Sequence, residues 1–528
     1  MGEIYKRAKR VVVWLGEGDP ATEVAMRRIL DIGQLGVAKI KSDEEKTRLD
    51  DTLRLLFGIG AVDSSQDPLS PFFELSWFHR MWTVQEVTLP PLDNVDVQYG
   101  PVSSKWVFVL LAVKLLKITK YKWGKWDEAT HLQKEISAMF MEKRNPPFRE
   151  ILETDSADAV PYRGTLQLLV SMRPKKATDS RDKVFALIGV AKELGLDLPP
   201  PDYGKSLEQV YIETAVVCIK NDSSLNALYE APSKNRRAGL PSWVPDWGDE
   251  SWNSFELSKY VAEKAFRAAG ANNPQWSFSQ DWQRLIVSGK LIDSIDTCCA
   301  ALELETDFNN DFVGIGSGKT KFKDFWKRFQ PPVDILRTWV HLSSQCKTYP
   351  TKEPVESAFR STLLDGSFVR KQHTPSDVSF EKWFDFMKSS ESDALTSLFA
   401  RSQGSHIQST GKSNLTDKGM QDEQKTFPAA GFQSFLALSS TSASEFHFAA
   451  LRQAKGKCFF STTNGYFGLA IGTAQSGDQI ALIPGLDIPF ILRKAGQRYT
   501  LVTYGYVHGI MCGEGWNTPT AAEIFTIA

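Results

Sequence analysis

The stretch from Pro71 to Leu89, PFFELSWFHRMWTVQEVTL, constrains the fold of this chain more than any other segment. We call it the signature segment. Four of its side chains recur at the i, i+4, i+7, i+11 spacing of one helical face: Phe78, Trp82, Gln85 and Leu89. This spacing predicts a loop that leads into a single amphipathic helix. The pair Pro90 and Pro91 ends that helix, because proline lacks the N–H that the next turn needs.

A second set of side chains lies on a neighbouring face of the same predicted helix. His79, Trp82 and Glu86 are spaced i, i+3, i+7, which brings a histidine, a tryptophan and a carboxylate together. Two interpretations are open. In the functional one, this dense mixture forms a site. In the structural one, the aromatic residues of the segment anchor a core and its charged residues face solvent.

Composition is that of a soluble globular protein with a sizeable core. The chain has 528 residues, 42% of them hydrophobic and 24% charged, a length that suggests two to four domains. Lysine and arginine number 62 and aspartate and glutamate 63, so the net charge is −1. We therefore expect neither nucleic acid nor an anionic membrane as a partner.

Cysteine and histidine usage bears on compartment and metal binding. The six cysteines form no C-x-x-C pair, and the adjacent Cys298 and Cys299 are expected to be ordinary thiols. This pattern favours a reducing, cytoplasmic compartment. The seven histidines form no H-x-x-x-H or H-E-x-x-H pattern, so no metal site is predicted. The most apolar stretch, 106–111, continues into lysines and predicts a core segment and no membrane span.

The first residues predict an α/β layer. Val11 to Leu15 is a β-branched apolar run, expected to form a buried parallel strand. A glycine turn follows, in which Asp19 can cap the next helix and Pro20 suits its first position. A second strand is expected at 95–99.

A charge cluster precedes the apolar run 184–190. It consists of Asp179, Arg181 and Asp182. Either an arginine–carboxylate network fixes a helix start here, or the cluster forms a polar site beside the signature segment. Further on, Ser206 and Gln209 form a capping-box pattern that predicts the start of a helix.

The second half of the chain has a different character. From Arg284, RLIVSGKLIDSI alternates around a glycine as a bent strand would, and 451–510 returns to short strands with glycine turns. We expect Leu285 to Ile295 to pair with those later strands. The run GIGSGKT, 314–320, has one residue too few between its glycines for a phosphate loop, so no nucleotide site is predicted.

The signature segment resembles the fungal heterokaryon incompatibility (HET) domain, whose signature runs roughly W-F-x-R-x-W-x-x-Q-E. Six residues match it: Trp77, Phe78, Arg80, Trp82, Gln85 and Glu86. Four further stretches resemble other blocks of the family in the expected order: 1–19, 177–191, 201–215 and 240–247.

The resemblance implies a fold. The family domain is likened to Toll/interleukin-receptor domains, so an α/β, partial flavodoxin-like domain is expected at 1–230. The family's opening motifs, L-S-Y-x-W-G and W-I-D-A-x-C-I-N-Q, do not occur, and the domain is expected to be truncated at its N-terminus. The remaining divisions are a linker and docking segment (231–283), a β-rich C-terminal module (284–300 and 451–515), a helix-rich insertion (301–400) and a disordered loop (401–427).

The resemblance also implies a role in non-self recognition that leads to growth arrest or programmed cell death in fungi. Two mechanisms are open. In the first, the domain is a signalling module that binds other proteins or itself, without turnover or cofactor. In the second, it cleaves NAD as a substrate: Glu86 would steady the ribose cation, Trp82 would stack on a base and Arg80 would meet a phosphate.

Overall fold

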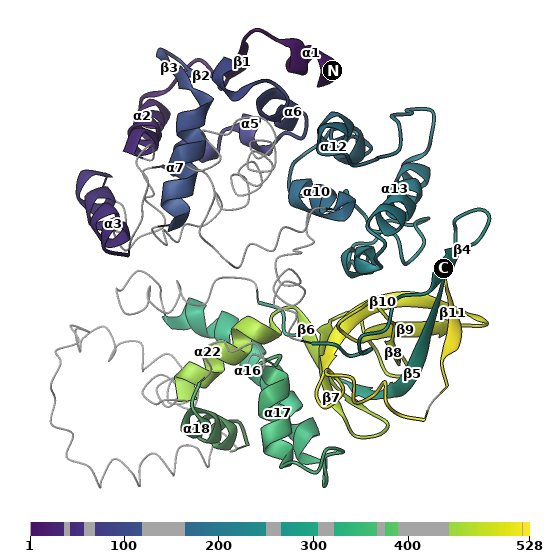
Figure 1. The fold of residues 1–528 in the computed structure, drawn as a ribbon. Coiled ribbons are helices and arrows are strands. Elements are labelled where there is room, and N and C mark those ends of the chain that lie inside the picture. Colours follow the sequence, from purple (N-terminus) through teal and green to yellow (C-terminus); the bar gives the residue numbers. More distant parts are fainter. Residues whose placement is uncertain are drawn as a thin grey trace, which may run out of the picture. The chain divides into compact units, whose positions relative to one another are not determined.

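The computed structural model describes residues 2–35, 43–57, 69–118, 164–249, 266–304, 322–366, 375–388, 443–519 and 521–528 (Figure 1). The chain divides into two compact units, Met1–Glu256 and Leu257–Ala528, which we call the N-terminal and C-terminal units. The tract predicted to be a disordered loop, 401–427, and the glycine-rich run 314–320 lie outside the described residues.

The N-terminal unit contains a three-stranded sheet in the order β1-β2-β3. Strand β1 (Val11–Trp14) runs parallel to β2 (Val95–Tyr99), with Val11 opposite Val95. Strand β3 (Val102–Lys105) returns antiparallel to β2. Both strands that the sequence predicted are therefore confirmed, and so is the parallel pairing of the first.

Only one face of this sheet is buried. Val13 packs into a core made with helices α2 (Pro20–Leu35) and α7 (Trp106–Ile118), and Val11 on the same face is also buried. In contrast, Val12 is 44% exposed and Trp14 is 49% exposed. The expectation of a fully buried strand was wrong. Strand β1 is the edge of the sheet, and among the described residues the helices of this core lie against one face.

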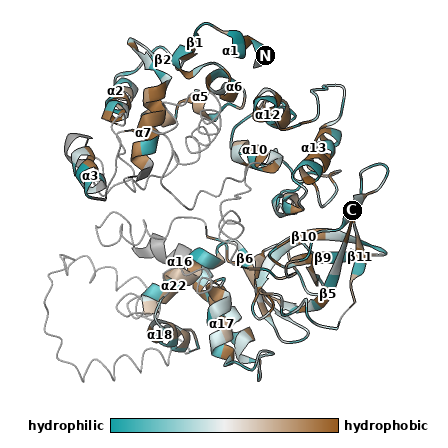
Figure 2. Ribbon diagram, viewed as in Figure 1, coloured by the Kyte–Doolittle hydropathy of each residue, from teal (hydrophilic) through white to brown (hydrophobic). Residues whose placement is uncertain are grey.

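The two core helices lie very close together. Helix α7 is almost entirely apolar and is brown along most of its length in Figure 2. A Cβ atom at Gly33 of α2 would lie 2.0 Å from the carbonyl oxygen of Phe108, so only glycine allows this approach. The predicted cap of α2 is confirmed, because the amide of Thr22 donates to Asp19 Oδ1 at 3.0 Å.

Further helices complete the described part of the N-terminal unit. They are α1 (Gly2–Arg7), α3 (Asp43–Phe57), α4 (Ser70–Phe73), α5 (Ser76–His79), α6 (Thr83–Thr88), η2 (Leu92–Asn94), α10 (Thr165–Met172), α11 (Asp182–Phe185), α12 (Ile188–Leu194), α13 (Leu207–Asn221) and η3 (Asn226–Glu230). The capping box predicted at Ser206 and Gln209 begins α13. The single helix predicted in the signature segment was wrong, because the chain is extended at Arg80 and divides the segment into α5 and α6.

The C-terminal unit is built on a closed sheet, drawn from dark green to yellow in Figure 1. Its strands are β4 (Trp276–Phe278), β5 (Leu285–Cys298), β6 (Lys457–Thr462), β7 (Phe467–Ile471), β8 (Gln479–Leu482), β9 (Phe490–Ala495), β10 (Arg498–Val507) and β11 (Glu523–Ile527). Pairings of β11 with β5 and of β10 with β9 close the path into a barrel. Strand β5 pairs with β4, β6, β8 and β11, so the predicted pairing of Leu285 to Ile295 with later strands is confirmed.

Helices α16 (Phe322–Ser344), α17 (Val355–Leu363), α18 (Asp377–Lys388) and α22 (Ala443–Ala454) pack against the barrel through one aromatic core. Trp339 stacks on Phe459 of β6, and Phe359 meets the same ring edge-on. The chain is therefore a mixed α/β protein with a β-rich C-terminal sheet, as expected. The finer domain divisions stay predictions.

Candidate functional site

The break in the signature segment is made by a second segment of the N-terminal unit. The amide of Met81 donates to the carbonyl of Lys176 at 2.8 Å, and the amide of Lys176 donates to the carbonyl of His79 at 2.5 Å. Arg80, between them, has the φ of −85° and ψ of 138° of a strand. A backbone bridge therefore replaces one turn of helix and joins the signature segment to the residues around 176.

Two buried lysines strengthen this junction. Lys175 Nζ donates to the carbonyl of Phe78 at 2.6 Å, at the end of α5, and its burial lowers its pKa to about 7. Lys183 Nζ donates to the carbonyl of Arg173 at 2.9 Å and also to that of Lys175. Each ammonium group satisfies carbonyl oxygens that the irregular backbone leaves without a helical partner.

A buried arginine holds the junction to the segment 240–247. The Arg173 guanidinium pairs with Glu230 at 3.0 Å, and both side chains are at most 5% exposed. It also donates to the carbonyl of Asp246 at 2.5 Å and lies 5.8 Å from the centre of the Trp247 ring. Burial lowers the pKa of Arg173, although the Glu230 charge opposes that shift. The predicted role of 231–283 in docking a following domain stays a prediction.

Three signature side chains lie inside the N-terminal unit. Trp77 and Phe78 are buried against Trp106, with the two tryptophan rings 5.2 Å apart and edge-on. The Gln85 amide nitrogen donates to the carbonyl of Ala186 at 2.5 Å. These contacts join the signature segment to the α7 core on one side and to the end of α11 on the other.

The Glu86 carboxylate, which the sequence put forward as a catalytic group, is held by two aromatic donors. Trp77 Nε1 donates to one oxygen at 2.9 Å and the Tyr5 hydroxyl to the other at 3.4 Å. Burial, followed by the nearby Glu86 charge, raises the pKa of Tyr5, and the positive charge of Arg80 opposes this shift. Glu86 therefore joins α1, α5 and α6 in a half-buried position, and its catalytic role stays a prediction.

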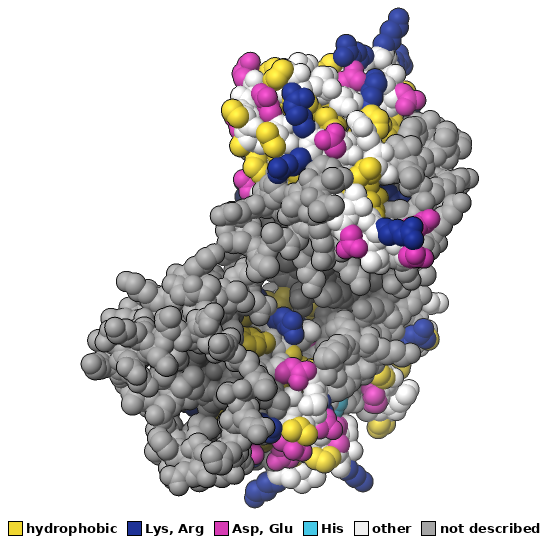
Figure 3. Space-filling model, turned by 90° about the vertical axis from the view of Figure 1, so that its left-hand side faces the viewer, with side chains coloured by type: hydrophobic (Ala, Val, Ile, Leu, Met, Phe, Trp, Pro, Cys, Tyr) yellow, Lys and Arg dark blue, Asp and Glu magenta, His cyan; other side chains and the backbone are white. Residues whose placement is uncertain are grey.

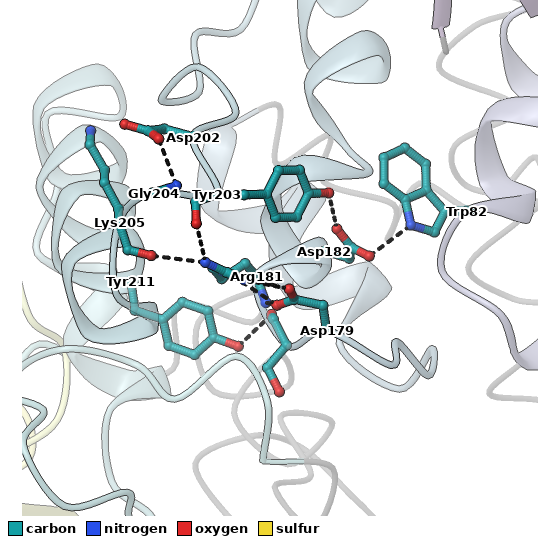
Figure 4. A network of polar contacts seen from close by, with 10 residues as sticks. Trp82, Asp179, Arg181, Asp182, Asp202, Tyr203, Gly204, Lys205 and Tyr211 are labelled. Carbon is teal, nitrogen blue, oxygen red and sulfur yellow. Dashed lines mark hydrogen bonds and ion pairs between the residues drawn. The ribbon is translucent and has the colours of Figure 1, made fainter.

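A polar network surrounds Asp182, in the first turn of α11 (Figure 4). Its carboxylate accepts a hydrogen bond from Trp82 Nε1 at 2.9 Å and another from the Tyr203 hydroxyl at 2.6 Å. The structure therefore brings together two sets of residues that the sequence singled out separately, Trp82 of the signature segment and the charge cluster at 179–182.

Arg181 forms the other half of this network. Its guanidinium pairs with Asp179 at 2.7 Å and donates to the carbonyls of Tyr203 and Lys205 at 2.7 and 3.0 Å. The hydrogen bonds from Arg181 lower the pKa of Asp179. The Tyr211 hydroxyl donates to the carbonyl of Ser180 at 2.8 Å and joins α13 to the same loop. The cluster lies at the start of α11 and contacts the signature segment through Asp182, and its role stays a prediction.

The network displays one aromatic ring at the surface. Tyr203 is 51% exposed, although its hydroxyl is bound to Asp182 and its ring lies 5.1 Å from the Arg181 guanidinium. Its pKa is raised to about 12 by burial of the hydroxyl and then by the Asp182 hydrogen bond. Arg80 is also exposed and joins this region through its backbone bridge to Lys176.

The sequence did not predict the buried cations at 173, 175 and 183, nor Glu230, Tyr5 and Tyr203. The cluster of basic residues RPKK at 173–176 was the available signal, but lysine is almost never fully buried unless it is paired. A basic run of this kind therefore predicts side chains exposed at the protein surface.

The described residues contain neither a candidate metal site nor a membrane-spanning helix. Among them, no group of three histidine, cysteine, aspartate or glutamate side chains could hold a metal ion. In the same ranges, no helix has the length and apolar character that a membrane crossing requires. On the face shown in Figure 3, lysine and arginine side chains are interspersed with aspartate and glutamate.

Two family models match the chain. The heterokaryon incompatibility protein (HET) model matches residues 1–86, which end at Glu86 of the signature segment. The Het-6 beta-barrel domain model matches residues 352–527. Over these two ranges the chain is similar to heterokaryon incompatibility proteins of the HET-domain family. The range matched by the Het-6 beta-barrel model begins after β5, although β5 pairs with β11 to close the barrel.

A curated relative agrees with this assignment. Heterokaryon incompatibility protein 6, OR allele, from Neurospora crassa is 25% identical over 584 aligned positions, which cover 100% of this chain and 80% of the relative. No solved structure matches the chain.

Proposed function

We propose that this chain acts in fungal heterokaryon incompatibility as a protein-interaction or assembly module whose engagement leads to growth arrest or programmed cell death. The observation that carries the proposal is the fixed, exposed aromatic side chain of Tyr203, held by Asp182 and Arg181. The family assignment supports the biological setting. The module works in the cytoplasm, on other proteins or on a second copy of itself.

Binding at Tyr203 costs little conformational entropy, for the following reason. An exposed tyrosine whose hydroxyl and ring are already held by neighbours loses little conformational freedom when a partner covers it. Tyrosine and arginine are also enriched among the residues that carry most of the binding energy in protein interfaces. Tyr203 and Arg181 combine both features on one surface.

We also propose that the N-terminal unit is a partial flavodoxin-like or Toll/interleukin-receptor-like domain. The parallel pair β1 and β2, connected through helices α2 to α6, supports this. A parallel pair needs such a crossover connection, and helical crossovers are typical of that fold class.

The first test is forced expression in a fungal host, with viability and cellular NAD measured in parallel. We expect growth arrest with NAD unchanged. Tyr203→Ala should abolish the arrest because it removes the exposed ring. Tyr203→Phe, the matched control, keeps the ring and should retain most of the effect.

The enzymatic alternative has its own variant. Glu86→Gln keeps the size of the side chain and removes the charge that a ribose cation would need. A fall in NAD that Glu86→Gln prevents would overturn the assembly proposal. Equal toxicity of Tyr203→Ala and the native chain would show that the proposed surface is not the interface.

A further inference from the structure

Two cysteine side chains face each other in the barrel of the C-terminal unit. Cys298 is the last residue of β5 and Cys458 lies in β6, and their sulfur atoms are 3.4 Å apart. Both are free thiols. Cys458 is buried, whereas Cys298 is partly exposed, so one member of the pair is open to a small reagent.

The sheet explains why these two side chains meet. Cys298 is opposite Phe460 in the antiparallel ladder between β5 and β6, so Cys458 is its diagonal neighbour on the same side of the sheet. Both pack in one apolar cluster with Ile295, Ala470 and Ile480. The register of the ladder shifts between Ile295 and Thr297, and the amide of Cys299 still donates to the carbonyl of Phe459 at 2.9 Å beyond the end of β5.

The thiols differ in reactivity. The hydrogen bond between the two sulfurs lowers the pKa of Cys298 and raises that of Cys458. Burial raises the pKa of the neighbouring Cys299 to about 11. Because the thiolate is the nucleophile, Cys298 is the member of this group that reacts first with an oxidant.

We propose that Cys298 and Cys458 form a reversible intramolecular disulfide when the protein meets a peroxide. The Cys298 thiolate attacks one oxygen of hydrogen peroxide, its O–O bond breaks, and sulfenic acid and hydroxide form. The Cys458 sulfur then attacks the Cys298 sulfur, loses its proton and displaces hydroxide, which leaves as water. In sum, two thiols and one hydrogen peroxide give one disulfide and two water molecules.

The required movement is small. A disulfide bond is about 2.0 Å long, so the sulfurs must approach by roughly 1.4 Å from their separation of 3.4 Å. The bond would join β5 to β6 across the intervening residues 299–457. Because the stabilisation by a cross-link grows with the length of the loop it closes, this position suits a bond that tightens the barrel under oxidising conditions.

The test is peptide mapping of the full chain after treatment with one equivalent of hydrogen peroxide and alkylation of the remaining thiols. We expect a mass loss of about 2 Da from the two thiol hydrogens, together with a cross-link between tryptic peptides 291–319 and 458–493 that dithiothreitol reverses. Melting of the oxidised C-terminal unit should shift upward by about 5 °C.

Three variants locate the bond. Cys298→Ala should abolish the cross-link, whereas Cys299→Ser, in the same tryptic peptide, should retain it. Cys512→Ser removes an exposed cysteine and should also retain it. The proposal is overturned if both peptides stay fully alkylated, or if the peroxide product joins Cys298 to Cys299 or links two chains through Cys512.

Discussion

The two units of this protein hold distant segments together in different ways. In the N-terminal unit, buried cations at 173, 175 and 183 bind backbone carbonyls, and Lys175 joins the signature segment to a stretch about a hundred residues later. In the C-terminal unit, a continuous ladder of strands closes on itself and an aromatic layer covers one side. The distant segments of the first unit are joined by a few directional contacts, and the strands of the second are joined by many.

This difference between the two units indicates where a single substitution should reduce stability most. A directional polar contact fixes the position of its partners, but its loss leaves a buried charge or carbonyl unsatisfied. Loss of one contact in a closed ladder leaves its neighbours in place. The three predictions below test this contrast.

The largest effect is expected at Arg173. Arg173→Met removes the guanidinium that pairs with the buried Glu230 carboxylate, which should lower the free energy of unfolding of the N-terminal unit by about 3–5 kcal/mol. Urea denaturation followed by tryptophan fluorescence measures this. Arg48→Met removes an exposed ion pair with Glu44 and is the matched control, with an expected change of about 0.5 kcal/mol or less. A loss under about 1 kcal/mol for Arg173→Met would contradict the contrast.

A smaller effect, dependent on pH, is expected at Lys175. Its pKa is about 7 in the folded protein and 10.5 ordinarily, so between these values the unfolded chain binds more protons and stability rises with pH. From pH 7 to 9 the free energy of unfolding of the N-terminal unit should increase by about 2 kcal/mol. Denaturation at several pH values should show this gain in the native protein and in the exposed control Lys176→Met. If Lys175→Met keeps the gain, another group is responsible.

The smallest effect is expected in the C-terminal unit, at His447. Burial lowers its pKa to about 3 from 6.5, and Trp383 Nε1 donates to its Nδ1 at 3.1 Å. The unfolded chain therefore binds a proton first as pH falls, and stability present above pH 6.5 is lost progressively below it. Between pH 6.5 and 5 the loss should be about 1.5 kcal/mol. His447→Asn, which keeps an acceptor, should remove it in thermal melts, whereas His341→Asn at an exposed position should not.

The last two predictions give each unit its own pH window. The N-terminal unit gains stability above pH 7, and the C-terminal unit loses it below pH 6.5. One common window for both units would mean that they unfold together and that the contrast between them does not govern their stability.

Sequence patterns predicted the strands and helix starts that depend on residues close together in the chain. The β-branched run at Val11, the Asp19 cap and the Ser206 capping box each depend on residues a few positions apart, and each is present. The glycine-centred alternation at 285–295 also sufficed to predict β5.

The features that the sequence did not predict depend on contacts between distant parts of the chain. The break at Arg80 is made by the backbone of Lys176, and no pattern inside the signature segment contains it. Trp82 and Asp182 were each singled out, but their hydrogen bond joins residues 100 positions apart. Lysine is rarely buried, so the burial of Lys175 was not expected. Its partner is the backbone carbonyl of Phe78, and every residue has a backbone carbonyl, so the sequence gives no sign of this contact.

The position of β5 in the chain has a consequence for synthesis. This strand ends at Cys298, and its neighbour β6 begins at Lys457, so 158 residues, 299–456, must be translated between them. At about 5–20 residues per second, β5 leaves the ribosome roughly 8–30 s before β6, and later still for β11. During that interval β4 is its only partner among the strands that the structure describes, and its other edge offers backbone groups to neighbouring nascent chains. The barrel can therefore close only after the last of its strands, β11, has been synthesised.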